Sequence, residues 1–442
     1  MYFWLIFMPA SAVIFQYAGI TRNRKLAAFL VVFVTIVLSL LSAAADFDMA
    51  GLPDKLMYGN EVFLLARGSR TFGDLLSTTR DTWLAGDTGY LLLNFVLSRL
   101  SSNPRFFYFG LSLLNSLLVG TIIMLSRKLG AAGFMWVQYL IQFYHISQNA
   151  LRQSPAFALA IIGVILTARK KRWIGLFVGL LGLTFHTTAI IFILFWLITV
   201  FITSNDRVRR LKPIPLLLVT AFLSANALYV LDLWGAVSGG LYMEYLSTED
   251  YAIFGLGSGQ GFSGSDITRI IGAILALAYI YKQRNIKQQG EYGEFPDMSD
   301  AVAGVLLLLA VVEVLLIPVR AITLPMQRLI IYAGFATIPA YGILFTSFKK
   351  HISRLTFSLV ILSPLLLGNR LDREYRSQVI NDSLVGLNPT SVTFSVLSAL
   401  IIALAFYCVM AIRSAGKQNS IPVSVSRTIS PRFSQRQLIS ST

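Results

Sequence analysis

The sequence carries very little charge for its length. Only 13% of its 442 residues are Asp, Glu, Lys or Arg, whereas 55% are hydrophobic. Soluble domains carry about 25% charged residues, so this chain has too few to cover a water-exposed surface. Its mean hydropathy is +0.68. These values exclude a soluble globular protein. Because helices satisfy their own backbone groups in lipid, we predict an all-α polytopic membrane protein.

Cysteine is almost absent as well. The chain has one cysteine, Cys408, which lies inside an apolar run. A single thiol excludes an intrachain disulfide and any cysteine-based metal site. The sequence also contains no long hydrophilic stretch from which a soluble domain could be built. We therefore expect one membrane domain followed by a tail.

The basic residues outnumber the acidic ones, and the formal net charge is +16. Such a charge is found in nucleic-acid-binding proteins, but its distribution here argues against that class. The Lys and Arg residues form short clusters between apolar runs, where they set topology by the positive-inside rule. We expect no nucleic acid partner, and we expect membrane lipids to contact most of the surface.

The alternation of charge predicts the topology. Seven acids oppose four bases between Asp46 and Gly89, and five acids with no base lie between Asp232 and Asp266. Both segments are therefore placed outside the cytoplasm, with the N-terminus periplasmic and the C-terminus cytoplasmic. Since a span needs roughly 20 apolar residues, we predict about thirteen transmembrane helices in a bacterial inner membrane. They are Tyr2–Ile20, Leu26–Ala45, Phe106–Leu125, Ala131–His145, Pro155–Thr167, Trp173–Leu183, Thr188–Phe201, Pro213–Leu231, Ile267–Tyr281, Ala301–Ile317, Leu329–Phe348, Leu355–Leu367 and Thr393–Ile412.

This topology defines the domain organisation. Residues 1–412 form the membrane domain, with periplasmic loops at 46–105, 232–266 and 368–392. Within the first loop, Gly89–Leu100 is apolar but too short to span, so we expect it at the outer interface or re-entering the membrane. Residues 413–442 are basic and rich in Ser, which predicts a disordered cytoplasmic tail that rests on anionic headgroups.

Several distant polar residues converge on the outer side in this topology. Arg152 and Gln153 lie in the turn between the fourth and fifth spans. A guanidinium there can grip a phosphate with two parallel hydrogen bonds, although an interfacial Arg can also extend to lipid headgroups. We favour the phosphate interpretation, because Arg152 lies inside a tight Gln-Ser-Pro hairpin.

His186 lies between two spans that contain no other titratable group. Neutral imidazole can act as a base, and its cation can hold an anion. The alternative is a histidine satisfied by the hydroxyl of Thr187 or Thr188. A metal site is not expected, because His145 and His351 fall on opposite sides of the membrane.

Other outer residues are candidates as well. Arg328 opens an apolar helix with Tyr332 one turn later on the same face. The remaining candidates for substrate contact are Arg320, Asp46, Asp48 and Asp87. A carboxylate at Asp46, Asp48 or Asp87 competes with His186 for the role of base. Glu313, inside the tenth span, is interpreted as the ion-pair partner of an inward Arg rather than as a proton relay.

These residues also carry a family likeness. The motifs are Gly86-Asp-Thr-Gly-Tyr-Leu-Leu92, Asn149-Ala-Leu-Arg-Gln153 followed by a Lys/Arg block, Phe185-His-Thr187 and Arg328-Leu-Ile-Ile-Tyr332. In their order and spacing the chain resembles the EpsG-type branch of the Wzy-like bacterial polysaccharide polymerases, from about residue 46 to residue 345. Ser154 and Pro155 replace the usual Ile or Leu after Arg-Gln.

The resemblance implies a GT-C-like membrane fold and an inverting glycosyl transfer without nucleotide sugar, cofactor or obligatory metal. The donor is then an undecaprenyl-diphosphate-linked glycan, the acceptor is a single repeat unit on the same lipid carrier, and the product is a chain longer by one repeat. A chain-length regulator protein becomes a candidate partner. His186, Arg152 and Arg328 take the catalytic roles, and Arg320, Gln153, Asp46, Asp48, Asp87 and Tyr332 contact substrate. An O-antigen ligase and a glycolipid flippase or transporter remain alternatives from the sequence, and a membrane O-acyltransferase is a weaker one.

Overall fold

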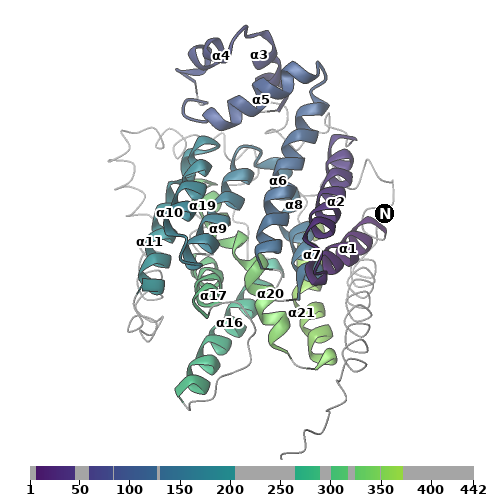
Figure 1. The fold of residues 1–442 in the computed structure, drawn as a ribbon, viewed down its shortest axis with the longest axis vertical. Coiled ribbons are helices and arrows are strands. Elements are labelled where there is room, and N and C mark those ends of the chain that lie inside the picture. Colours follow the sequence, from purple (N-terminus) through teal and green to yellow (C-terminus); the bar gives the residue numbers. More distant parts are fainter. Residues whose placement is uncertain are drawn as a thin grey trace, which may run out of the picture.

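The computed structural model describes residues 6–44, 59–82, 84–126, 130–204, 264–288, 300–316, 324–348 and 350–371. All regular elements in these ranges are helices, most of them gathered in one bundle with a small group of three helices at one end (Figure 1). The helices of the bundle are α1 (Met8–Ile20), α2 (Arg24–Ala44), α6 (Arg105–Leu125), α7 (Ala132–Gln142), α8 (Tyr144–Asn149), α9 (Gln153–Ala168), α10 (Arg172–Leu180), α11 (Ile191–Ser204), α16 (Gly264–Gln288), α17 (Asp300–Leu315), α19 (Leu324–Phe335), α20 (Thr337–Ser347) and α21 (His351–Leu371).

Three helical segments are long and apolar enough to cross a membrane: α2, α6 and residues 330–347. Each predicted span in the described ranges coincides with a helix or with two consecutive helices. The fourth span is divided into α7 and α8, and the eleventh into α19 and α20. The predicted spans Pro213–Leu231 and Thr393–Ile412 lie outside the described residues, so the number of about thirteen stays a prediction.

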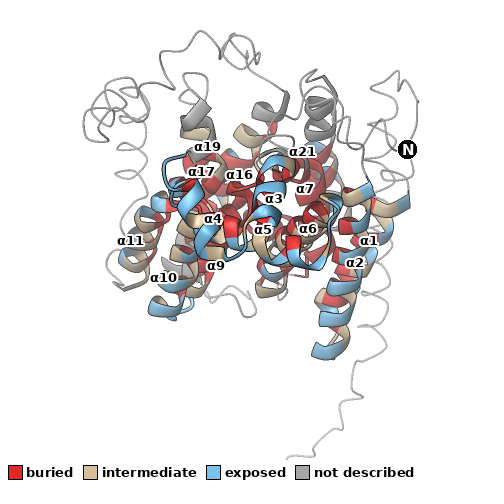
Figure 2. Ribbon diagram, turned by 90° about the horizontal axis from the view of Figure 1, so that it is seen from above, coloured by how far each residue is buried: buried red, intermediate tan, exposed pale blue. Residues whose placement is uncertain are grey.

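The centre of the bundle consists of helices that are buried on every side. Nearly all residues of α7, α9 and α20 are buried, and most of them are apolar, as is typical of a helix in a protein core. By contrast, Trp173 and Phe177 on α10 are 77% and 65% exposed. Figure 2 shows buried residues at the centre and exposed ones on α2, α10 and α11 at the periphery. Large exposed apolar side chains at the periphery fit a surface that faces lipid.

Buried polar side chains join α1 to α7. The Trp136 indole stacks on Phe15 at 4.1 Å between ring centroids and donates to Ser11 Oγ at 2.9 Å. The Gln16 amide donates to the Gly130 carbonyl at 2.8 Å and accepts from the Gly133 amide at 3.0 Å. In lipid an unmatched polar group is costly, so these paired contacts fix the two helices against each other.

Glycines bring α9 and α10 into contact. A Cβ on Gly163 would lie 2.7 Å from the Gly175 carbonyl oxygen, and one on Gly175 would lie 2.6 Å from that of Gly163. Small residues of this kind allow membrane helices to approach closely. α9 ends at Ala168, and Lys170, in the turn that leads to α10, has a φ of 66° in the left-handed region. This turn contains the basic block that predicts a cytoplasmic connection.

A helical cap covers one end of the bundle. It contains α3 (Val62–Gly68), α4 (Phe72–Thr79) and α5 (Thr88–Leu100), which lie together at the top of Figure 1. Thr71 and Asp74 form a capping box at the start of α4. Arg67 donates to the Ser98 carbonyl at the end of α5, and Arg99 donates to the Ala66 carbonyl at the end of α3. Within the predicted loop 46–105, the described residues 59–82 and 84–105 are therefore folded.

The cap has an apolar core that reaches into the bundle. Phe63, Leu75 and Tyr90 of the cap cluster with Phe107 of α6 and with Leu151, the residue before Arg152. Gly89–Leu100 almost coincides with α5, which lies in the cap. The shared core therefore fixes the position of the cap relative to the hairpin that carries Arg152.

The bundle also contains a buried ion pair. Arg269 Nε on α16 lies 3.2 Å from Glu313 Oε1 on α17, and the two side chains are 11% and 2% exposed. The expectation that Glu313 pairs with an inward Arg is confirmed. Because charges within a membrane protein are stabilised by pairing with one another, this contact joins α16 to α17.

Candidate functional site

Two glycines place Asp87 between the cap and the bundle. Gly86 has a φ of +94°, which an L residue rarely adopts. Gly89, at the start of α5, approaches Thr184 so closely that a Cβ would lie 3.1 Å from the Thr184 carbonyl oxygen and closer still to its hydroxyl. The segment 86–89 therefore rests directly on the turn 181–190, which holds the short 3₁₀ helices η4 (Leu181–Thr184) and η5 (Thr187–Ile190).

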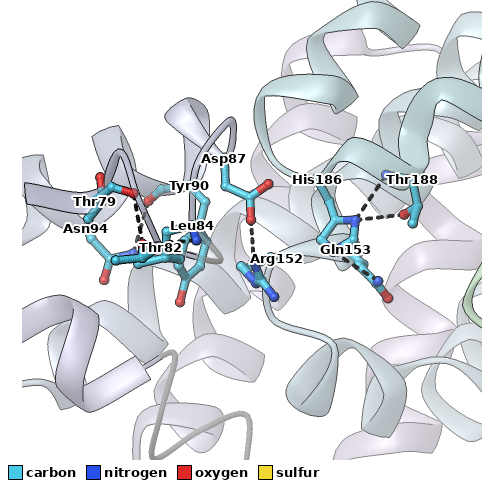
Figure 3. Close-up of polar contacts among 10 residues, drawn as sticks. All are labelled: Thr79, Thr82, Leu84, Asp87, Tyr90, Asn94, Arg152, Gln153, His186 and Thr188. Carbon is cyan, nitrogen blue, oxygen red and sulfur yellow. Dashed lines mark hydrogen bonds and ion pairs between the residues drawn. The ribbon is translucent and has the colours of Figure 1, made fainter. Parts of the chain in front are cut away.

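Asp87 forms an ion pair with Arg152. Asp87 precedes the first residue of α5, where an Asp side chain commonly caps the helix, yet it makes no capping hydrogen bond. Its Oδ2 instead lies 2.5 Å from Nη1 of Arg152, at the start of α9 (Figure 3). The two side chains are 3% and 10% exposed. The carboxylate therefore links the cap to the hairpin between α8 and α9.

The surroundings of Asp87 change its acidity. Burial raises the pKa of Asp87 from its ordinary 3.8 to about 6, and the charge and hydrogen bond of Arg152 act in the opposite direction. Asp87 is therefore a carboxylate that can gain or lose a proton near neutral pH. Groups with such pKa values are suited to general base catalysis.

A second set of contacts surrounds His186. Its Nε2 lies 3.3 Å from Nε2 of Gln153, the first residue of α9, and its Nδ1 lies 2.8 Å from Thr188 Oγ1. Thr188 Oγ1 also lies 3.2 Å from the Tyr332 hydroxyl on α19. Figure 3 shows Gln153 and Thr188 on either side of the imidazole, with the Asp87–Arg152 pair nearby. Residues from α9, η5 and α19 are thus joined in one polar chain.

The backbone explains why His186 lies there. His186 is extended, with φ −162° and ψ 135°, and its side chain caps η5 by accepting the Thr188 amide. The residue is 8% exposed. Of the two hydroxyls that the sequence offered as partners, Thr188 makes the contact. Tyr332 is fully buried and packs edge-on against Phe157, at 4.5 Å between ring centroids.

Comparison with known proteins supplies the family. The EpsG family matches residues 28–369. The chain belongs to the EpsG family. The match begins within α2 and ends within α21, so it contains the cap, the Asp87–Arg152 pair and the contacts around His186. No curated protein sequence and no solved structure matches the chain.

The EpsG family match covers all the residues that the sequence proposed for the site, but the structure describes only some of them. Asp87, Arg152, Gln153, His186 and Tyr332 come from four separate segments and lie in the two neighbouring sets of contacts. Asp46, Asp48 and Arg320 lie outside the described ranges. Their roles stay predictions. The backbone of Arg328 lies one turn before Tyr332 in α19.

Two relationships were missed from the sequence. Asp87 was expected to contact substrate or to act as a base, and its ion pair with Arg152 was not predicted. Thr188 was considered only as a partner that satisfies His186, yet it also contacts Tyr332 and so connects His186 to α19. The spacing of His186 and Thr188, two residues apart, is a local signal of a capping turn. No sequence pattern around Thr188 indicates that its hydroxyl contacts Tyr332.

Proposed function

We propose that this membrane protein is a polysaccharide polymerase of the bacterial inner membrane. It transfers an undecaprenyl-diphosphate-linked glycan onto a lipid-linked repeat unit at the periplasmic face. Membership of the EpsG family supports the polymerase class. The observation that carries the chemistry is the pairing of a buried guanidinium with a buried carboxylate whose pKa is about 6.

Arg152 stabilises the leaving group in this proposal. The bond that breaks joins the anomeric carbon of the donor to a lipid diphosphate, which leaves with the bonding electrons and additional negative charge. A guanidinium can bind phosphate oxygens with two hydrogen bonds, and its charge acts strongly where water is excluded. The low exposure of Arg152 supports this role. Arg328, and Arg320 earlier in the same predicted outer turn, supply further positive charge.

Asp87 accepts the proton of the acceptor hydroxyl. As the hydroxyl oxygen bonds to the anomeric carbon, its proton passes to the carboxylate. A single displacement places the attacking and leaving oxygens on opposite faces of the sugar and inverts the anomeric centre. Asp87 and Arg152 touch in the resting state, so their contact must open before they can serve opposite faces.

The diphosphate provides the reason for that opening. It competes with Asp87 for the guanidinium and draws Arg152 toward the leaving group. The carboxylate then loses its counter-charge, and because an opposite charge lowers the pKa of a carboxyl group, its loss makes Asp87 a stronger base. Binding of the donor thereby activates the group that the next step requires. Asp46 and Asp48 contact the sugar units, and Tyr332 supports the site through Thr188.

A deletion strain and the purified protein test the proposed function together. In the deletion strain we expect lipid-linked single repeats to accumulate, measured by mass spectrometry. Long unattached polymers would instead indicate a ligase, and a loss of periplasmic single repeats would indicate a flippase. The purified protein, given only a lipid-linked repeat in detergent, should produce lipid-linked dimers and longer chains. Failure of both assays contradicts the proposal.

A further inference from the structure

The neighbours of His186 indicate which of its two ring nitrogens carries the proton. The backbone amide of Thr188 donates to Nδ1 at 3.2 Å. An amide N–H has no acceptor role, so Nδ1 must carry its lone pair on the side that faces Thr188. A neutral imidazole has one protonated nitrogen. The proton of neutral His186 therefore lies on Nε2.

This tautomer decides the orientation of Gln153. The nitrogen and oxygen of a side-chain amide are assigned from their hydrogen-bond partners, and a protonated Nε2 requires an acceptor. The oxygen of Gln153 must therefore face His186, at the 3.3 Å position. The NH₂ group then occupies the other position, where no donor of the described residues faces the buried amide atom. Gln153 is 3% exposed, so a substrate oxygen that reaches this position would pair with a buried donor.

We propose that His186 is a positioning residue: its Nε2–H holds the Gln153 carboxamide so that the NH₂ group donates to the lipid-linked glycan diphosphate, and His186 itself takes no proton in the reaction. This inference rests on the proposed polymerase function and deepens it. Of His186 and Gln153, it is Gln153, next in the chain to Arg152, that contacts the substrate. Phosphate oxygens and sugar hydroxyls are both acceptors for this donor.

The same geometry explains why His186 is a poor base. The Nε2 atom, which faces Gln153, has no lone pair in this tautomer. The Nδ1 lone pair faces the Thr188 amide and hydroxyl, and protonation there would set two N–H groups against each other. Contact between Thr188 and Tyr332 restrains this turn further. The imidazole is thus restrained from α19 through Thr188 and Tyr332, and it orients the Gln153 side chain on α9.

Three substitutions of His186 distinguish a positioning role from a role as base. The amide nitrogen of a glutamine reaches roughly the place of Nε2, so His186→Gln can still donate to Gln153. An asparagine reaches only Nδ1, so His186→Asn can cap η5 but cannot hold Gln153. We expect His186→Gln to retain activity within about tenfold, and His186→Asn and His186→Ala to lose on the order of 10²-fold in kcat/KM. The pH at which kcat/KM falls on the acid side should be the same in His186→Gln as in the parent.

A spectroscopic measurement tests the tautomer without any assay of activity. The chain has three histidines, so a sample with ¹⁵N-labelled histidine gives few ring signals, which His145→Gln and His351→Gln assign by difference. We expect His186 to show a protonated Nε2 and an unprotonated Nδ1 at pH 7.5. A protonated Nδ1, or a His186→Gln variant as inactive as His186→Ala, overturns the proposal. If the expected tautomer is found but the parent makes no polymer, only the polymerase function fails.

Discussion

Asp87 and Arg152 stand 65 positions apart in the chain, and their side chains meet at 2.5 Å between Oδ2 and Nη1. This contact holds the cap against the start of α9. It also gives Arg152 a carboxylate partner that a diphosphate can displace. If one of the two residues is replaced, a loss of activity can therefore have two causes: a missing catalytic group, or a buried charge that has lost this ion-pair partner.

A pair of variants separates these readings. Asp87→Asn should destabilise the protein by about 3–5 kcal/mol, because it leaves the Arg152 charge buried without its carboxylate. The double variant Asp87→Asn/Arg152→Gln should recover most of that stability and stay inactive. Thermal unfolding in detergent and polymer assays at equal protein amounts measure both effects. Recovery of polymerisation in the double variant would mean that the pair is structural only.

The activity should depend on pH through Asp87. The base must be deprotonated, so kcat/KM, which reports the free protein, should fall as the pH drops through about 6. In the complex Arg152 is engaged by the diphosphate and no longer lowers the pKa of Asp87. The corresponding fall in kcat should therefore occur at a higher pH than that in kcat/KM. Coincident profiles, measured with a lipid-linked repeat from pH 5 to 8, would contradict the opening of the pair.

The shape of the Arg152 head group should matter as well as its charge. Arg152→Lys keeps one positive charge but loses the planar fork, so we expect kcat/KM to fall about 10²-fold. Arg70→Lys is a matched control, because Arg70 is exposed in the cap. Chain-length distributions on gels, at equal expression, compare the two. Unchanged distributions in Arg152→Lys would remove Arg152 from the transfer step.

The fit of the cap on the bundle can be tested at Gly89. A side chain there meets Thr184, so Gly89→Val should push α5 away from η4 and displace Asp87. Misplacement of a reacting group by about 1 Å can cost on the order of 10²-fold in rate. Gly73→Ala is the control, because its Cβ makes only an ordinary contact at 3.7 Å in α4. If both variants polymerise normally, the position of the cap does not set the rate.

The predicted topology has a direct test. In a Cys408→Ser background, a membrane-impermeant maleimide should label Ser102→Cys, between the cap and α6, on intact cells. Lys170→Cys, in the turn after α9, should be labelled only after the cells are permeabilised. Labelling of position 170 from outside would reverse the assignment of sides.

The sequence was sufficient for features that depend on composition along the chain. The 13% charged residues and the apolar runs require a membrane protein, and the helices α2 and α6 begin and end within two residues of their predicted bounds. Such features are local, because a helix in lipid satisfies its backbone within itself. The helical cap was not predicted, because its short helices are stabilised by a core shared with Phe107 and Leu151.

The sequence by itself determined which residue types the site contains: it singled out Asp87, Arg152, Gln153, His186 and Tyr332 as polar residues near helix ends. Only the tertiary structure decided which of them touch. The Asp87–Arg152 pair depends on the close approach of Gly89 to Thr184, and the contact of Thr188 with Tyr332 spans 144 positions. Charge and hydropathy place a residue along the membrane normal, whereas its neighbours in the membrane plane are decided by how the helices pack.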